Sequence, residues 1–437
     1  MLEYFGTDGI RGKANEFLSG ELAYKCGNAL AQLKKDALIV IGRDTRVSGE
    51  MLTLALSAGA MAGGADVYDV GVIPTAGVAY LVKRCKADFG VVISASHNPA
   101  EYNGIKVFSS RGYKLEEAEE EKIERKMPAQ KFVKSAEVGR FAQRFDLAED
   151  YVQSVLSVCE GTLDGMKIAL DCSNGAAFKI APEIFRKTGA EVFCIGTNSN
   201  GYDINAGCGS LHPERLAAFV TENGLDAGFA FDGDADRLIA VDEKGKIADG
   251  DQLIYLFACD MKERGALKGD CAVGTTHTNM GVERALAKKG VKLLRSDIGD
   301  KYVKELMLKK GSNVGGEQSG HIILSDYATT GDGILSAIFA ACVMKRSGKP
   351  LSALANAELY PQCNVNVPVQ DKVRVLGSET LRAALENARD KLGDRGRVVV
   401  RASGTEQVIR VFAETQSESL SKETAFELAK VVSQAEK

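Results

Sequence analysis

The fold is decided by the stretch ALIVIGRDTRVSGEMLTLALSAGAMAGG, residues 37–64. It opens with a β-rich apolar run, continues through a polar loop and ends in the pattern of a helix. A new strand signal, ADVYDVG (65–71), follows directly. Buried parallel strands read as near-continuous apolar runs, because helices cover both faces of their sheet. The stretch is therefore predicted to be a strand–helix–strand unit with parallel strands.

The same pattern occurs twice more. MKIALDCSNGAAFKIAPEIFRKTG (166–189) and CAVGTTHTNMGVERALAKKG (271–290) each pass from strand to loop to helix, and AEVFCIG and VKLLRSD follow them. We therefore expect three similar mixed α/β domains. The C-terminal part differs, because three strand signals there surround two helical runs, which indicates a smaller α+β domain. The expected domains are 1–150, 151–248, 249–361 and 362–437.

Composition narrows the class of protein. The chain has 437 residues, of which 45% are apolar and 26% charged, as in folded globular proteins. Its net charge of −4 gives no bulk attraction to nucleic acid or membrane. The 10 cysteines form no C-x-x-C pair, so zinc sites and a disulfide framework are not expected. Without a signal segment or a membrane-length apolar run, we expect a cytoplasmic protein.

The segment FGVVISASHNPAEYNGIKVF (89–108) carries the first candidate chemistry. A predicted strand ends at Ile93, and hydroxyl side chains follow at the carboxyl edge, where α/β sheets place ligands. Ser94 or Ser96 could be a nucleophile or a phosphoryl carrier. The alternative is a Ser-rich turn before a proline. Lys106 could neutralise a phosphate or transfer a proton, or it could be an ordinary exposed lysine.

The segment GFAFDGDADRLIAVD (228–242) gives the sharpest local signal. Asp232, Asp234 and Asp236 alternate between two apolar runs, and in an extended segment this spacing puts all three carboxylates on one side. Three converging carboxylates repel one another unless a hard divalent cation such as Mg²⁺ lies between them. The alternative is a solvated acidic turn. Arg237 could pair with an aspartate or with a substrate phosphate.

Three further segments carry polar side chains near glycines. In NVGGEQSGHIILSDYATTGDG (313–333), oxygen and nitrogen groups suited to sugar hydroxyls and amines precede His321, a candidate acid or base; a polar hairpin is the alternative. VVVRASGTEQVIRVFAE (398–414) has the arginines and hydroxyls of a phosphate cradle, or of a hairpin with surface arginines. FGTDGIRG (5–12) looks like a tight turn that presents Arg11.

Taken in this order, the five segments resemble the α-D-phosphohexomutase superfamily over nearly the whole chain. The resemblance implies four domains around a central cleft, with one motif contributed by each. FGTDGIRG and GEQSGH (316–321) are most similar to the branch that interconverts glucosamine 6-phosphate and glucosamine 1-phosphate. Relatives that act on mannose or glucose phosphates usually carry a different residue at position 318.

The resemblance also implies a role for each candidate residue. Ser96 is expected to be the phosphoserine, and an oxygen of its phosphate should complete a Mg²⁺ site formed by Asp232, Asp234 and Asp236. Lys106 and His321 are expected to transfer protons, and Arg11 and Arg237 to stabilise charge. The substrate should be bound by His97, Glu317, Gln318, Ser319, Arg401, Ser403, Gly404, Thr405 and Arg410.

The function implied by the resemblance is phosphomutase chemistry through a 1,6-bisphosphate, in UDP-N-acetylglucosamine and cell-wall precursor synthesis. A phosphomannomutase or phosphoglucomutase is the alternative within the superfamily. A metal-dependent sugar-phosphate phosphatase is the alternative from another class. The expected partner is a small sugar phosphate, with no nucleic acid and no membrane, and the protein should be a monomer or a homodimer.

Overall fold

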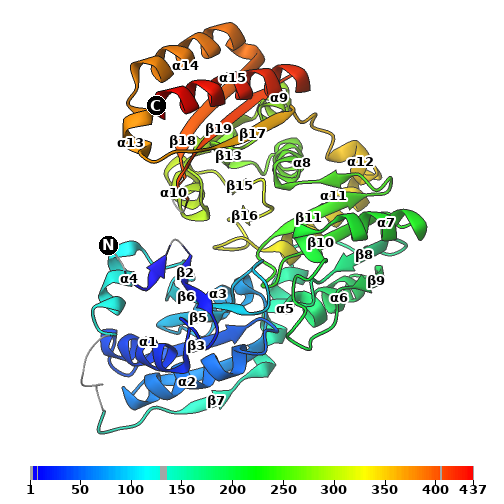
Figure 1. The fold of residues 1–437 in the computed structure, drawn as a ribbon. Helices are drawn as coiled ribbons and strands as arrows, with labels where there is room; N and C mark the ends of the chain where they lie inside the picture. Colours follow the sequence, from blue (N-terminus) through cyan, green and yellow to red (C-terminus); the bar gives the residue numbers. More distant parts are fainter. Residues whose placement is uncertain (1–2, 7, 128–134, 404–405, 437) are drawn as a thin grey trace. The chain divides into compact units, whose positions relative to one another are not determined.

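The computed structural model describes residues 3–6, 8–127, 135–403 and 406–436. The chain forms two compact units, and Figure 1 shows their elements. The first unit comprises Met1–His277 and Gly290–Asn356, and the second comprises Thr278–Lys289 and Ala357–Lys437. The first unit contains three sheets and the second contains one.

The first sheet has seven strands in the order β1-β2-β6-β5-β3-β4-β7. β3 pairs in parallel with β4 and β5, whereas β6 runs antiparallel to β5. The carboxyl ends of the parallel strands therefore lie at one edge of the sheet. The strands are β1 (Phe5–Gly6), β2 (Gly9–Lys13), β3 (Leu38–Arg43), β4 (Asp66–Val72), β5 (Phe89–Ile93), β6 (Tyr102–Ser109) and β7 (Phe141–Gln143).

Helices cover both faces of this sheet. Ile39 and Ile41 of β3 lie in one core with side chains of α1 (Gly20–Leu33), α2 (Gly49–Ala62) and α4 (Glu117–Glu124). Successive strand residues point to opposite faces, and Gly42 accordingly meets Val78 of α3 (Thr75–Arg84). Burial on both faces explains why β3 is an almost continuous apolar run.

The second sheet has the order β12-β11-β10-β8-β9. Its strands are β8 (Lys167–Asp171), β9 (Glu191–Ile195), β10 (Ala227–Phe231), β11 (Leu238–Asp242) and β12 (Ile247–Ala248). Its helices are α6 (Ala177–Lys187) and α7 (Glu214–Glu222), and α5 (Ala148–Leu156) precedes it in the chain. β10 and β11 form an antiparallel hairpin whose connection carries the three aspartates.

The third sheet has the order β14-β13-β15-β16. Its strands are β13 (Cys271–Thr275), β14 (Lys292–Ser296), β15 (Val314–Gly316) and β16 (Ile322–Leu324). The helices of this part are α8 (Gly250–Glu263), α10 (Asp300–Lys310), α11 (Gly333–Ser347) and α12 (Leu351–Leu354). β15 and β16 form an antiparallel hairpin that carries residues 317–321 in its connection.

The second unit is built on an antiparallel sheet in the order β17-β19-β18. Its elements are α9 (Met280–Lys288), β17 (Gln362–Pro368), α13 (Lys372–Leu376), α14 (Glu379–Leu392), β18 (Gly396–Ala402), β19 (Val408–Thr415) and α15 (Glu418–Glu436). Short 3₁₀ helices occur in both units. The first unit contains η1 (Phe145–Leu147), η2 (Gly209–Leu211) and η3 (Lys268–Asp270), and the second contains η4 (Gly393–Arg395).

The predicted fold class is confirmed. All three strand–helix–strand units are present, and their strands pair in parallel: β3 with β4, β8 with β9, and β13 with β14. One helix is placed differently from the expectation, because α9 groups with the second unit rather than with its flanking strands. Among the described residues, which include all ten cysteines, none is joined in a disulfide. Among the described helices, none has the length and apolar character needed to cross a membrane.

A buried carboxylate at the start of α11 should make stability depend on pH. Asp332 caps the helix by accepting from the N–H of Leu335, and the Tyr151 hydroxyl donates to it at 3.0 Å. Burial raises the pKa of Asp332 to about 6. This group's contribution to stability is therefore complete below the unfolded pKa of about 3.9 and is lost as the pH rises through about 6.

We expect Asp332→Asn to remove the loss of stability that Asp332 causes as the pH rises. Between pH 4 and pH 7.5, the stability of the variant relative to the parent should improve by on the order of 3 kcal/mol, measured as melting temperature against pH. The matched control is Asp371→Asn, the same exchange at the exposed cap of α13. A stability difference between Asp332→Asn and the parent that does not vary with pH would contradict the expectation.

Candidate active site

The loop after β5 separates the two candidate serines. The Ser94 hydroxyl donates to Asp44 Oδ2 at 2.6 Å and accepts from the Ser96 main-chain N–H, so it is engaged within the loop. Ser96 Oγ points the other way and donates to Asp232 Oδ2 at 2.6 Å. Ser96 is buried, with 1% of its surface exposed. Of the two serines, only Ser96 reaches the acidic cluster.

The acidic cluster lies in a turn rather than in an extended strand. Asp232, Asp234 and Asp236 occupy the connection between β10 and β11, and Ala235 has a left-handed φ of 55°. The expectation of an extended segment was therefore wrong, because the chain reverses here. The turn still brings one oxygen from each carboxylate within 4.8 Å of the others.

The three carboxylates have the donor atoms of a metal site. Oδ1 of Asp234 and Oδ1 of Asp236 are buried, and no described group donates a hydrogen bond to either. Burial and the two neighbouring aspartates raise the pKa of Asp232, as expected for converging carboxylates. Carboxylate and hydroxyl oxygens are the ligands that hard divalent cations prefer. The cluster, together with Ser96 Oγ, could hold such an ion.

Lys106 is buried beside the cluster, with 1% of its surface exposed, and is not an ordinary surface lysine. Its Nζ lies 2.7 Å from Asp234 Oδ2 and 3.6 Å from carboxylate oxygens of Asp236 and Asp8. Burial alone would lower the pKa of Lys106, but the surrounding carboxylates outweigh it and raise the pKa above its usual value. The side chain is therefore protonated and positively charged in this cluster.

Two arginines near the cluster have an unused donor each. Nε of Arg11 and Nε of Arg237 are buried, and neither donates to any described group. Arg11 pairs with Asp8, and the main-chain N–H of Arg237 donates to Asp232 Oδ1 at 3.1 Å. A buried guanidinium N–H without an acceptor is costly unless an anion supplies one. Both arginines are therefore suited to a phosphate.

The two histidines have different surroundings. His97 Nδ1 lies 3.2 Å from Ser96 Oγ, and burial together with Arg237 and Arg11 lowers the pKa of His97 to about 4, so its ring is neutral. His321 is buried, and Gly331 N–H donates to its Nε2 at 3.1 Å. Its proton is therefore on Nδ1, 3.5 Å from Asp236. Burial would lower the pKa of His321, but Asp236 and Asp300 raise it.

The segment expected to bind the sugar forms the β15–β16 turn. Glu317 Oε1 accepts from the main-chain N–H of Gly299 at 3.1 Å, and Gln318 Nε2 donates to Asp249 Oδ2 at 3.0 Å. Ser319 is exposed. In this arrangement Gln318 Nε2 is directed to Asp249, the cap of α8.

The expected phosphate residues lie in the second unit. Arg401 and Arg410 face each other across β18 and β19, and burial together with Arg410 lowers the pKa of Arg401. Like charges placed opposite each other in a sheet are unfavourable unless an anion lies between them. The Arg410 Nε is buried and donates to no described group, and Lys372 donates to the carbonyl of Ser403 at 2.9 Å. Gly404 and Thr405 lie outside the described residues.

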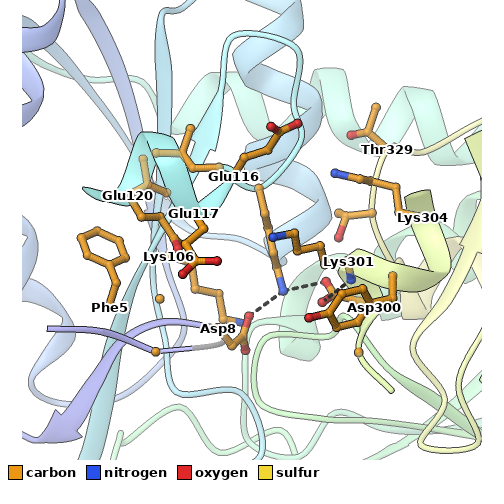
Figure 2. A pocket seen from close by; sticks show the side chains of 18 of the residues that line it. Phe5, Asp8, Lys106, Glu116, Glu117, Glu120, Asp300, Lys301, Lys304 and Thr329 are labelled. Carbon is orange, nitrogen blue, oxygen red and sulfur yellow. Dashed lines mark hydrogen bonds and ion pairs between the residues drawn. The ribbon is translucent and has the colours of Figure 1, made fainter. Parts of the chain in front are cut away.

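One charged cluster of the first unit was not predicted. Lys114 Nζ lies 2.5 Å from Asp8 and 2.7 Å from Asp300, and the cluster lines a cavity of about 390 Å³, shown in Figure 2. The charges of Lys106, Lys114 and Arg11 hold the pKa of Asp8 well below its usual range, although burial alone would raise it. No local sequence pattern joins these three segments of the chain.

Four family models match the chain. They describe the phosphoglucomutase/phosphomannomutase alpha/beta/alpha domains I, II and III, at residues 2–134, 149–245 and 249–361, and the C-terminal domain of the same family, at residues 364–431.

Individual relatives match over the full length. A phosphoglucosamine mutase of Bacillus subtilis is 46% identical, with 99% of this chain and 98% of the relative covered. A family member from Burkholderia thailandensis has a crystal structure with TM-score 0.85 and 25% identity, covering 100% and 98% of the two chains. An Aspergillus fumigatus N-acetylphosphoglucosamine mutase, solved with GlcNAc-6P and magnesium, has TM-score 0.70 and 18% identity, covering 100% and 96%. At that identity the last likeness concerns the fold alone.

Proposed function

The chain belongs to the phosphoglucomutase/phosphomannomutase family, and on that basis we propose that it interconverts glucosamine 6-phosphate and glucosamine 1-phosphate. This activity makes it an isomerase that moves a phosphoryl group within its substrate. Phosphoglucosamine mutases that are 46% identical over 99% of the chain support the choice of sugar. The observation that carries the proposal is the hydroxyl of Ser96, held 2.6 Å from Asp232 inside a carboxylate cluster with unused oxygens.

Ser96 is the proposed phosphoryl carrier. O1 of glucosamine 6-phosphate attacks the phosphorus of phosphoserine, the bond from phosphorus to Ser96 Oγ breaks, and the proton that O1 loses is returned to Ser96 Oγ. The product is glucosamine 1,6-bisphosphate, which reorients in the site so that its 6-phosphate faces Ser96. Ser96 Oγ then attacks the phosphorus on O6, the bond from phosphorus to O6 breaks, and the proton that Ser96 Oγ loses passes to O6. Glucosamine 1-phosphate is released, and the phosphoserine is restored.

Asp232, Asp234, Asp236 and an oxygen of the phosphoserine would hold Mg²⁺. When bound, the ion would draw negative charge from the phosphoryl oxygens, which is the main requirement of phosphoryl transfer. The chain's own cations serve the same need. The unused Nε donors of Arg11 and Arg237 would bind phosphoryl oxygens as the transfer proceeds.

Lys106 and His321 are the proposed proton-transfer residues. Lys106 keeps its positive charge beside three carboxylates, so it can donate a proton to the departing O6. Asp236 and Asp300 raise the pKa of the buried His321 ring, which favours its acceptance of a proton. His97 is neutral and lies 3.2 Å from Ser96 Oγ, where it would orient the phosphoserine without adding charge.

The remaining candidates would bind the substrate away from the reacting phosphorus. Glu317, Gln318 and Ser319 would contact the sugar hydroxyls and the amino group. The non-reacting phosphate would be bound by Arg401, Ser403, Gly404, Thr405 and Arg410. The opposed arginine pair supports an anion there, because a phosphate would offset their mutual repulsion.

The proposal is tested by comparing rates on glucosamine, glucose and mannose 6-phosphates. The protein is first loaded with a hexose 1,6-bisphosphate and supplied with Mg²⁺. We expect kcat/KM to be highest for the glucosamine phosphate by at least about tenfold. A faster rate with glucose or mannose phosphate would assign the chain to that branch of the family. Steady release of inorganic phosphate without an isomer product would indicate a phosphatase.

A further inference from the structure

The loop that carries Ser96 is held in an unfavourable backbone conformation. Ser96 has a φ of 53°, in the left-handed region that side chains other than glycine rarely adopt. In that conformation Ser96 Oγ is directed to Asp232, while the main-chain carbonyl of Ser96 points away from Asp232. A residue kept in this region must be fixed by its surroundings. The question is which groups fix it.

Arg46 is the main such group, and its side chain is buried, with 2% of the residue exposed. Nε donates to Asp44 Oδ2 at 2.9 Å, and Nη2 donates to the carbonyl oxygens of Ser96 and Asn98 at 2.9 and 2.8 Å. Nη1 donates to the carbonyl oxygens of Tyr102, at 2.9 Å, and Pro99. All five N–H groups of the guanidinium are therefore used, four of them on the segment from Ser96 to Tyr102.

The partner carboxylate holds the same loop from its other side. Asp44 accepts from the Ser94 hydroxyl at 2.6 Å, and that hydroxyl accepts from the Ser96 N–H at 2.9 Å. The pair of Asp44 and Arg46 thus fixes both the N–H and the carbonyl of Ser96. Asn205 adds a weaker support, because its Nδ2 donates to the carbonyls of Ser96 and Asn98 at 2.9 and 3.1 Å.

We propose that Arg46 is a positioning residue for phosphoryl transfer, which holds Ser96 in the left-handed conformation that aims its Oγ at Asp232. The inference rests on the proposed role of Ser96. A planar guanidinium suits this task, since its donors point in fixed directions and can reach four carbonyls at once. A lysine has one nitrogen with three N–H donors and cannot reproduce the array. Phosphoryl transfer depends chiefly on in-line placement, so a small displacement of Oγ should slow the reaction.

The test is Arg46→Lys, which keeps the charge and loses the array. We expect kcat to fall about 10²-fold with KM unchanged within about threefold. The rate at which a hexose 1,6-bisphosphate loads Ser96, followed by intact mass, should fall by the same factor. A role in stability alone would lower the melting temperature without slowing the loading of the folded fraction.

The matched control is Arg43→Lys. Arg43 is also a buried arginine at the end of β3, and it pairs with Asp69 at 2.8 Å without contacting the Ser96 loop. The Arg43→Lys variant should keep kcat within about threefold of the parent. Equal losses of kcat in the two variants, a change in KM alone, or an unchanged loading rate in Arg46→Lys would overturn the inference. Turnover by the parent protein tests the proposed function separately, so the two failures are distinguishable.

If Arg46→Lys does not fold, a second variant tests whether hydrogen bonds to this loop position Ser96. Asn205 has a left-handed φ of 61°, which glycine adopts freely, so Asn205→Gly removes two hydrogen bonds to the loop with little backbone strain. We expect kcat and the loading rate to fall about tenfold with KM unchanged. Asn205 Nδ2 and Arg46 Nη2 donate to the same two carbonyls, those of Ser96 and Asn98. An unchanged loading rate in this folded variant would show that hydrogen bonds to these carbonyls do not position Oγ, and would overturn the inference.

Discussion

Replacing Ser96 by alanine should abolish mutase turnover, with a loss of at least about 10⁴-fold in kcat. The reason is chemical, because the reaction needs an oxygen that takes the phosphoryl group from one end of the sugar and returns it to the other. Ser96 Oγ is the hydroxyl that lies 2.6 Å from Asp232. Turnover is measured as conversion of glucosamine 6-phosphate, and the carrier as a species about 80 Da heavier by intact mass.

Ser94→Ala is the matched control, since it removes a hydroxyl two residues away. That hydroxyl donates to Asp44 and supports the Ser96 N–H, so we expect about a tenfold loss of kcat and full retention of the heavier species. If Ser96→Ala kept its turnover, or if the added mass remained in Ser96→Ala and disappeared in Ser94→Ala, the carrier would be wrongly assigned.

The two serines show what a local sequence pattern can settle. The string after β5 predicts a polar loop at the carboxyl edge of the sheet, and the loop is there. It does not say which hydroxyl faces the site, because that depends on Asp44, some fifty residues earlier in the chain. The family resemblance implied Ser96, and the hydrogen bonds show why the Ser96 hydroxyl, rather than that of Ser94, lies beside the acidic cluster.

The parallel strands were predictable because a strand that is buried on both faces has a nearly continuous apolar sequence. The run from 37 contains β3 (Leu38–Arg43), and the helical pattern behind it is α2 (Gly49–Ala62). In the second unit, β17 starts at Gln362, three residues before the strand-like run VNVPVQ (365–370), since its register with β19 pairs Gln362 with Glu414. That extension comes from pairing with a distant strand and has no local signal.

The three aspartates converge as predicted, although the backbone geometry that brings them together differs from the expected one. Alternation at positions 232, 234 and 236 suits a strand, but the chain turns between β10 and β11 with a left-handed Ala235. Alternate spacing alone does not distinguish a strand from a turn that brings side chains together. The cluster of Lys114, Asp8 and Asp300 had no pattern at all, because its members come from three separate segments.

Replacing Asp234 by asparagine should lower kcat by about 10²–10³-fold and raise the Mg²⁺ concentration needed for half-maximal rate at least about tenfold. Oδ2 of Asp234 is occupied by Thr75 and Lys106, at 2.6 and 2.7 Å, which fixes the carboxylate and leaves the buried Oδ1 free for the ion. Asparagine can keep one oxygen in the site, but it removes the negative charge. The measurement is the rate as a function of Mg²⁺ concentration.

Asp242→Asn provides the matched control for the metal assignment. Asp242 ends β11 in the same hairpin and is also buried, but its Oδ1 accepts from the main-chain N–H groups of Lys244 and Lys246. We expect it to lower the melting temperature and to leave the Mg²⁺ dependence unchanged. Equal Mg²⁺ titrations for Asp234→Asn and the parent would show that Asp234 is not a ligand. A shift of the same size in Asp242→Asn would show that the effect reflects the stability of the hairpin. Of these two aspartates, Asp234 is the one with a buried oxygen left without a donor.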